Sequence, residues 1–192
     1  MRFLLLALMV AVCAFSALAE DDYFPMNVGD EWTLAVTYVS ATGEVSEGLI
    51  HRKMNSAINR DGKTYYQLRT WTEGLPQKID TLKLVRHDEK AVYSIDARKD
   101  GAIEQVDFLL PLKVGTTWNR TTNTAVAVIG LDPVEIGGKH YENCFHVRST
   151  NAGTQMTEDF WLAPNIGNFK SLLAFGSGVK VTTTLKEFKP GK

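Results

Sequence analysis

The sequence predicts an all-β protein: a single antiparallel domain of about eleven strands, built as a barrel, a half-barrel or a sandwich. Apolar and polar side chains alternate over many short segments, as they do along half-buried strands. Turn-forming residues separate most of these segments. No segment after Ala19 keeps the apolar spacing of an amphipathic helix for three turns.

The composition is that of a globular domain with a core. The chain has 192 residues, of which 44% are hydrophobic and 22% are charged. Its 21 basic residues are scattered among 22 acidic ones, for a formal net charge of -1. This balance excludes the concentrated basic surface that nucleic-acid-binding domains present.

The first nineteen residues have the features of a secretory signal peptide. Arg2 supplies the positive charge, residues 3–15 are uninterruptedly apolar, and Ala17-Leu18-Ala19 provides a small-x-small cleavage motif. The run is too short to span a membrane. We therefore expect cleavage between Ala19 and Glu20, and a periplasmic or secreted protein with one domain over residues 20–192.

Cysteine usage fits a free, unanchored mature protein. Cys13 follows the bulky Val12 and lies inside the apolar run, which is unlike the position of a lipid-modified cysteine. Cys13 would leave with the signal, so Cys144 would be the only thiol and no intramolecular disulfide could form.

The strands are predicted from the period-two pattern and from intervening turns such as Asp61-Gly62. In order, they cover residues 32–39, 45–58, 63–72, 79–86, 91–95, 103–110, 117–129, 140–149, 155–162, 169–175 and 179–188.

One motif occurs twice. The pattern apolar-Pro-apolar-x-Val-Gly-x-x-Trp ends at Trp32 and again at Trp118, 86 residues later. We interpret this as a duplication that gives two similar halves, 23–109 and 110–192. In each half Pro stiffens the approach, Gly permits a bend, and Trp begins a strand. The two tryptophans are predicted to occupy equivalent buried places.

Three motifs together resemble those of a bacterial family. They are Tyr23-Phe24-Pro25-Met26-x-x-Gly29-x-x-Trp32, Leu110-Pro111-Leu112-x-x-Gly115-x-x-Trp118 and Trp161-x-Ala163-Pro164-x-Ile166-Gly167. The family contains exported or lipid-anchored β-rich proteins of uncharacterised role with a YFPL-x-x-G-x-x-W opening. Its members also have a segment like residues 141–147. The resemblance implies an envelope or secreted domain and supplies no catalytic residue.

The strongest candidates for metal chemistry share one strand. His140, Glu142, Cys144 and His146 have the same parity, so their side chains point the same way. Only neighbours such as Cys144 and His146 could share an ion, because the whole set spans ~20 Å. Chelation would need a ligand from another strand, and we expect no metal or other cofactor.

Signals for catalysis are weak. Gly176-Ser177-Gly178 is too short for a nucleophile elbow, and Cys144 lies in a strand rather than at a helix N-terminus. Glu158 and Asp159 are adjacent, hence on opposite faces of a strand. We therefore predict that the protein is not an enzyme.

The aromatic surplus suggests binding of an apolar molecule. Tyr65 and Trp71 share one face of a strand, and they are the candidate ligand contacts. We predict a non-enzymatic binding module that holds a lipid or other hydrophobic small molecule on a concave β face. The alternative is a structural or interaction protein of the envelope with a filled core, because filled and hollow barrels have the same pattern. A metal-dependent or hydrolytic enzyme is a lesser alternative.

Overall fold

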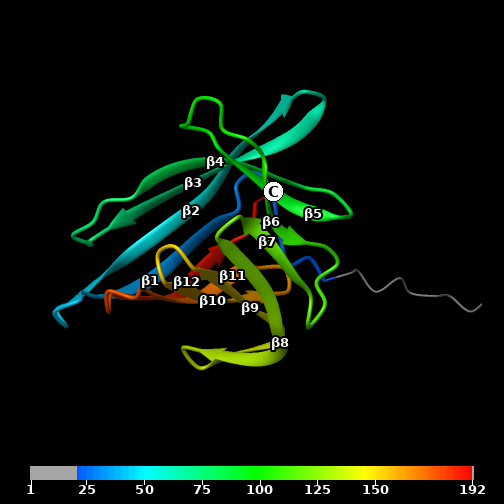
Figure 1. Cartoon of the computed structure of the whole chain (residues 1–192). Helices are drawn as coiled ribbons and strands as arrows, with labels where there is room; N and C mark the ends of the chain where they lie inside the picture. Colours follow the sequence, from blue (N-terminus) through cyan, green and yellow to red (C-terminus); the bar gives the residue numbers. More distant parts are fainter. Residues whose placement is uncertain (1–20, 192) are drawn as a thin grey trace, which may run out of the picture.

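The computed structural model describes residues 21–191, and every element in that range is a strand. The strands are β1 (Glu31–Val39), β2 (Val45–Arg60), β3 (Lys63–Glu73), β4 (Asp80–His87), β5 (Ala91–Asp96), β6 (Gln105–Leu109), β7 (Thr117–Thr121), β8 (Thr124–Ile136), β9 (Lys139–Asn151), β10 (Met156–Ala163), β11 (Gly167–Ala174) and β12 (Lys180–Lys189) (Figure 1). The all-β prediction is confirmed. The described part of the chain has no helix that could cross a membrane.

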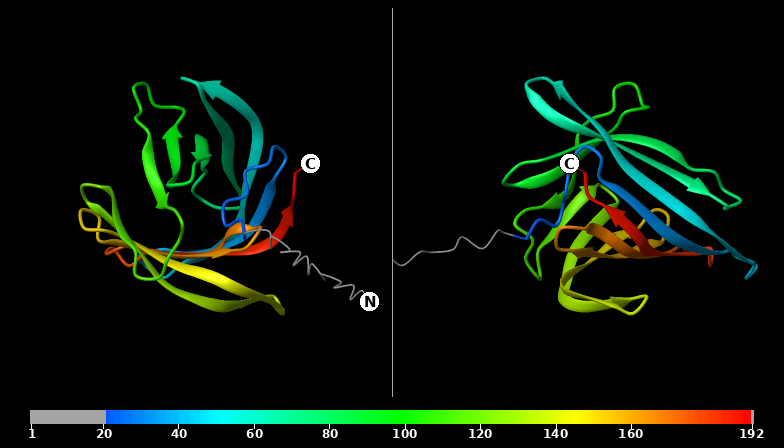
Figure 2. Two further views of the ribbon diagram at one scale, coloured as in Figure 1. Left: turned by 90° about the vertical axis from the view of Figure 1, so that its right-hand side faces the viewer. Right: turned by 180° about the vertical axis from the view of Figure 1, so that it is seen from behind.

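The strands form one antiparallel sheet made of two meanders. β1 to β6 pair in sequence order, as do β7 to β12, and β1 pairs with β12 to join the meanders. The sheet curves round on itself until its ends, β6 and β7, approach each other (Figure 2). The result is a nearly closed barrel with one ladder missing.

Strand number differs from the prediction at one place. The segment predicted as a single strand over residues 117–129 is two strands, β7 and β8, separated by a turn. The Thr121 hydroxyl accepts a hydrogen bond from the Asn123 amide (3.3 Å) and contacts the Thr124 hydroxyl (3.0 Å). Because threonine is common in strands as well as in turns, the sequence of this turn resembles that of a continuous strand.

Side chains from both meanders fill the interior. One buried cluster contains Trp32, Leu34, Met54 and Val85, and a second contains Val126, Val128, Val147, Phe160 and Leu162. Phe108 of β6 packs edge-on against Phe160 of β10, with ring centroids 5.5 Å apart, although these strands are far apart in the sheet. The barrel interior is therefore largely a packed core.

The segment before β1 belongs to this core. Phe24 packs against Phe108 at 4.6 Å, and Met26 contacts the cluster around Trp32. Asp30 is fully buried, and its carboxylate accepts hydrogen bonds from the amides of Asn27 and Gly191 (both 2.7 Å). The predicted signal peptide and its cleavage point between Ala19 and Glu20 lie outside the described residues.

Candidate functional site

Segments that are far apart in the sequence converge beside the open seam between β6 and β7. The Asn165 amide donates to the Asp22 carbonyl (2.6 Å), and the Tyr23 hydroxyl donates to the Asn143 carbonyl (2.8 Å). Gly167 has a positive φ of 81°, and a Cβ there would lie 3.4 Å from the Pro25 ring. The first and third motifs of the sequence therefore hold each other in place.

The segment before β1, the β4–β5 turn, the β6–β7 loop and Phe145 of β9 line an open groove of about 690 Å³, which we call the seam groove. Apolar and aromatic side chains supply most of its wall, and polar ones supply the remainder. The apolar members are Tyr23, Phe24, Leu110, Pro111, Leu112 and Phe145, and the polar ones are Asp21, Asp22, His87 and Glu89. This size and composition are typical of small-molecule sites.

Tyr23 has a central place in the groove. Its ring packs edge-on against Phe145 at 4.9 Å, and burial raises the pKa of its phenol, with a smaller contribution from the Asp21 charge. The phenol is therefore neutral at physiological pH, and its O–H donates a hydrogen bond to the Asn143 carbonyl. Tyr23 therefore contributes an uncharged aromatic surface rather than a nucleophile, while Asp21, Asp22 and Glu89 supply the acidic part of the groove wall.

A smaller space of about 160 Å³ lies on the barrel side of the same segment, and we call it the inner cavity. Tyr23 and Phe24 line both spaces, so they form the partition between them. The inner cavity is lined mainly by core residues such as Trp32, and it also contains Arg52 and Asn168. A third space, of about 120 Å³, lies among apolar side chains beside the β3–β4 loop.

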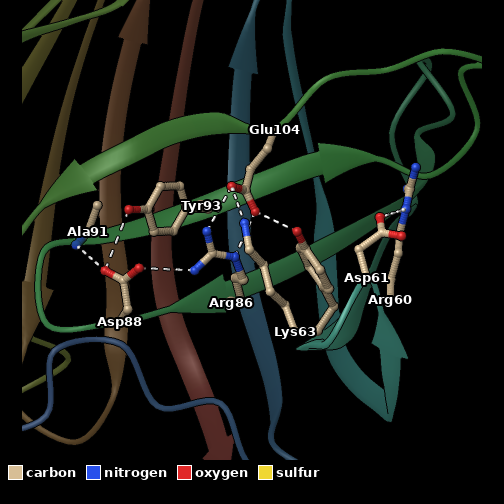
Figure 3. A network of polar contacts seen from close by, with 9 residues as sticks. Arg60, Asp61, Lys63, Arg86, Asp88, Ala91, Tyr93 and Glu104 are labelled. Atoms are coloured by element: carbon tan, nitrogen blue, oxygen red, sulfur yellow. Dashed lines mark hydrogen bonds and ion pairs between the residues drawn. The ribbon is translucent and has the colours of Figure 1, made fainter.

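Tyr65 lies elsewhere, on β3, where its hydroxyl contacts Glu104. Glu104 belongs to a polar network with Arg86 and Asp88 that joins β4 to the segment before β6 (Figure 3). Arg86 makes a two-pronged contact with Glu104 (2.7 Å for each prong), and it also contacts Asp88 at 3.1 Å. The Tyr65 hydroxyl donates to Glu104, and Arg86 stacks 3.8 Å from the Tyr93 ring centre. Every charge here has a partner, as expected of a structural network.

The network shifts the pKa values of its members. The hydrogen bonds from Arg86 lower the pKa of Glu104 to about 2, with a smaller contribution from Tyr65. Burial, with the hydrogen bond to Glu104, raises the pKa of Tyr65. Tyr65 is only 4% exposed, and it packs against Leu84 and Ile95 on the face of β3 opposite the Leu68 face. It does not line the seam groove or the inner cavity.

Trp71 also faces away from the barrel interior. Its ring stacks on the directly opposite His51 at 5.0 Å, and the Arg69 guanidinium lies 5.2 Å from the ring centre. The same strand presents Tyr66 and Leu68 to the core cluster. The concave face of β3 is therefore the one that carries Tyr66 and Leu68, and Tyr65 and Trp71 occupy the other.

The structure does not bring His140, Glu142, Cys144 and His146 together. His140 pairs with Glu142 at 2.9 Å in an exposed position, whereas His146 contacts Asp159 at 2.7 Å and stacks on Trp161. Cys144 is fully buried, and burial raises the pKa of its thiol to about 11. A kink at Asn143, with φ of 54°, interrupts the simple alternation. Within residues 21–191, no three metal-ligating side chains converge.

The structure adds two residues that the sequence reasoning did not choose as site residues. Tyr23 directly precedes the repeated pattern, which begins at Phe24 and is interpreted as an element of the fold rather than as part of a ligand site. Arg52 stands between Ile50 and Met54 at a position whose parity is apolar, and that break in the pattern is its only signal.

Comparisons with known proteins bear on the fold. No family model matches the sequence, and no curated protein matches it significantly. An exported-type protein with a YmcC-like fold from Bacteroides fragilis superposes with a TM-score of 0.53 and 11% identity, over 88% of this chain and 99% of that one. A lipoprotein-type chain from Parabacteroides distasonis gives 0.51 and 10%, over the same shares. The chain is thus similar in fold to these two proteins, and the prediction of a β-rich fold is supported to that extent.

Proposed function

We propose that this protein is an exported, non-enzymatic binding module that holds a hydrophobic or amphipathic small molecule in the seam groove. The observation that carries the proposal is the convergence of the first two motifs, at Tyr23-Phe24 and Leu110-Pro111-Leu112, with Phe145 of β9 on a groove of about 690 Å³ that has a largely apolar wall. Apolar wall area supplies most of the binding free energy in such a site, at roughly 25 cal/mol per Å² removed from water.

The filled interior supports this choice of place. Because Phe108 and Phe160 meet across the barrel, their rings occupy the interior at that level and leave less room there for a large ligand. The same observation favours the second candidate, an interaction protein with a filled core. The two differ in one respect, since only the first requires the seam groove to be occupied.

Export is supported by the sequence features at Arg2 and Ala19 and by the exported and lipoprotein-type proteins that share the fold. We expect the recovered mature protein to begin at Glu20. Intact-mass measurement of protein isolated from the cell envelope or medium checks this. A mass that includes a lipid on Cys13 would contradict it.

Binding is tested with an uncharged fluorescent naphthylamine probe and with native mass spectrometry of the purified protein. We expect Leu110→Gln to weaken probe binding about tenfold, because Leu110 lines the seam groove and is absent from the core clusters. Leu172→Gln is the matched control, since Leu172 is 39% exposed and lies outside the groove. Equal binding by the two variants, or no binding by the parent protein, would favour the interaction protein.

A further inference from the structure

Arg52 is the one arginine placed in the inner cavity. It lies directly opposite Trp32 in the β1–β2 ladder, so the two side chains project from the same face of the sheet. Met54 and Leu68 line the cavity beside it. Within residues 21–191, the Arg52 guanidinium has no side-chain hydrogen bond and no ion pair within 4.0 Å.

Arg86 shows how this chain satisfies a comparable cation. Arg86 is 8% exposed, and carboxylate oxygens of Glu104 and Asp88 approach its nitrogens at 2.7–3.1 Å. Arg52 is half-buried in more apolar surroundings, and burial lowers the pKa of its guanidinium. The Glu158 charge partly offsets that effect from beyond contact distance. A cation without close partners in such a place has unused capacity to bind an anion.

Asn168 supplies a further polar group to the same cavity. The Asn168 side-chain oxygen is buried and has no hydrogen-bond partner. A half-turn of the amide exchanges its oxygen and nitrogen, so Asn168 could donate a hydrogen bond to the same anion. The cavity of about 160 Å³ has the volume of roughly five liquid water molecules. A small head group such as a carboxylate fits in that space.

We propose that the ligand is a single-chain carboxylate whose head group enters the inner cavity and pairs with Arg52, while its apolar chain lies in the seam groove. This deepens the proposed function and rests on it. Tyr23 and Phe24 line both spaces, so one molecule that occupies both passes along these two rings.

The surrounding charges favour a monoanion. Arg52 supplies one positive charge, Glu158 already acts on it, and Asp21, Asp22 and Glu89 line the outer groove. A dianionic phosphate would meet more repulsion than attraction on this path, whereas a carboxylate matches the two-pronged guanidinium with a single charge. Burial of the apolar chain in the seam groove supplies favourable binding free energy that outweighs the repulsion between the carboxylate and these acidic side chains.

The test compares dodecanoate with dodecanol, measured by displacement of the uncharged naphthylamine probe from the mature protein at neutral pH. We expect the parent protein to bind dodecanoate at least tenfold more tightly than dodecanol. Arg52→Gln should remove that preference and leave dodecanol binding unchanged, while Arg52→Lys should retain part of it. Arg69→Gln is the control, because Arg69 is exposed and pairs with Asp80 on the other face of the sheet.

The outcomes separate the two proposals. Equal affinity for the two ligands in the parent protein, or a preference that survives Arg52→Gln, would overturn the assignment of the head group and leave the seam groove intact as a site. Failure of the parent protein to bind either ligand would overturn the proposed function as well. If Arg52→Gln does not fold, Asn168→Asp places a negative charge at the same cavity, and it should weaken dodecanoate selectively.

Discussion

The two copies of the repeated motif make the same local turn. The Gly29 amide donates to the Met54 carbonyl and the Gly115 amide donates to the Val128 carbonyl, each at 2.8 Å. The return bonds also correspond, since the amides of Met54 and Val128 donate to the carbonyls of Asp30 and Thr116 (2.9 Å each). The two turns therefore share one hydrogen-bond pattern, as the interpretation of a duplication requires.

The strands that follow the two turns have different surroundings. β1 pairs along its whole length with β2 and with β12, whereas β7 pairs with β8 alone. At the β6–β7 seam Arg120 makes the polar contacts: its guanidinium lies 3.6 Å from the Asp107 carboxylate and donates a hydrogen bond to the Asp107 carbonyl at 3.4 Å. A duplicated turn thus begins a closed seam in one copy and an open seam in the other. The seam groove lies beside the open one.

The two tryptophans report this difference most strongly. Trp32 is 6% exposed, stacks on Phe188 at 5.2 Å, and donates its indole N–H to the Ile166 carbonyl at 2.7 Å. Trp118 is half-buried, and its buried indole nitrogen has no hydrogen-bond partner. The two tryptophans were predicted to be equally buried, and this prediction is wrong: Trp118 is less buried than Trp32. The reason is that only the first copy of the motif lies in a closed part of the sheet.

Truncation of the tryptophans should have the largest effect and should separate the two copies. We expect Trp32→Ala to lower the free energy of unfolding by about 3–5 kcal/mol, because it removes a core ring and a hydrogen bond. Trp118→Ala should cost roughly 1–3 kcal/mol, in proportion to its smaller burial. Urea denaturation of both variants measures these values. Equal losses would show that the open seam contributes as much packing as the closed one.

Local patterns were sufficient to predict the strands, because alternation and turn residues act over a few positions. The missed turn at residues 121–124 shows the limit, since threonine suits a strand and a turn alike. The seam groove could not be predicted in the same way. It requires Tyr23, Leu110 and Phe145 to meet, and that meeting depends on how far the whole sheet curves.

The choice of Tyr65 and Trp71 shows a related limit. Period-two alternation separated them correctly from Tyr66 and Leu68, but it does not say which face is concave. The segment before β6, which contributes Glu104, covers the outer face at Tyr65 and buries it. A covered outer face and a core face therefore look the same in the sequence.

Substitution of Glu104 should have the next largest effect on stability. The ion-pair network of Glu104 lies in the first meander alone. Its pKa is lowered to about 2 from an ordinary 4.5, so the folded state favours the charged form. The resulting stabilisation is complete above about pH 4.5 and is lost as the pH falls towards 2. We expect Glu104→Gln to lower the free energy of unfolding by about 1–3 kcal/mol at pH 7, with a difference from the parent that shrinks below pH 4.5.

Thermal denaturation from pH 7 to pH 2.5 measures that difference. Other carboxylates also contribute to acid unfolding, so only the difference between variant and parent is informative. Glu142→Gln provides the control, because Glu142 is exposed and pairs only with His140. A Glu104→Gln variant whose deficit is the same at every pH would show that the network acts through packing rather than through charge.

The smallest expected effect concerns the turns themselves, where the two copies should behave alike. Gly29 and Gly115 have φ values of 97° and 88°, a region that side chains with a Cβ rarely adopt. Alanine at either position should cost about 1–2 kcal/mol from backbone strain. At Gly115 a Cβ would meet no atom within 4 Å, so strain is the whole cost there. Gly153→Ala, at a glycine without this conformation, should be nearly neutral.

Urea denaturation of the three variants measures the free energy of unfolding that each loses. A Gly115→Ala variant as stable as Gly153→Ala would show that the second turn relaxes at the open seam. Equal losses at Gly29 and Gly115, beside unequal losses at Trp32 and Trp118, would locate the difference between the copies in the sheet around the turns.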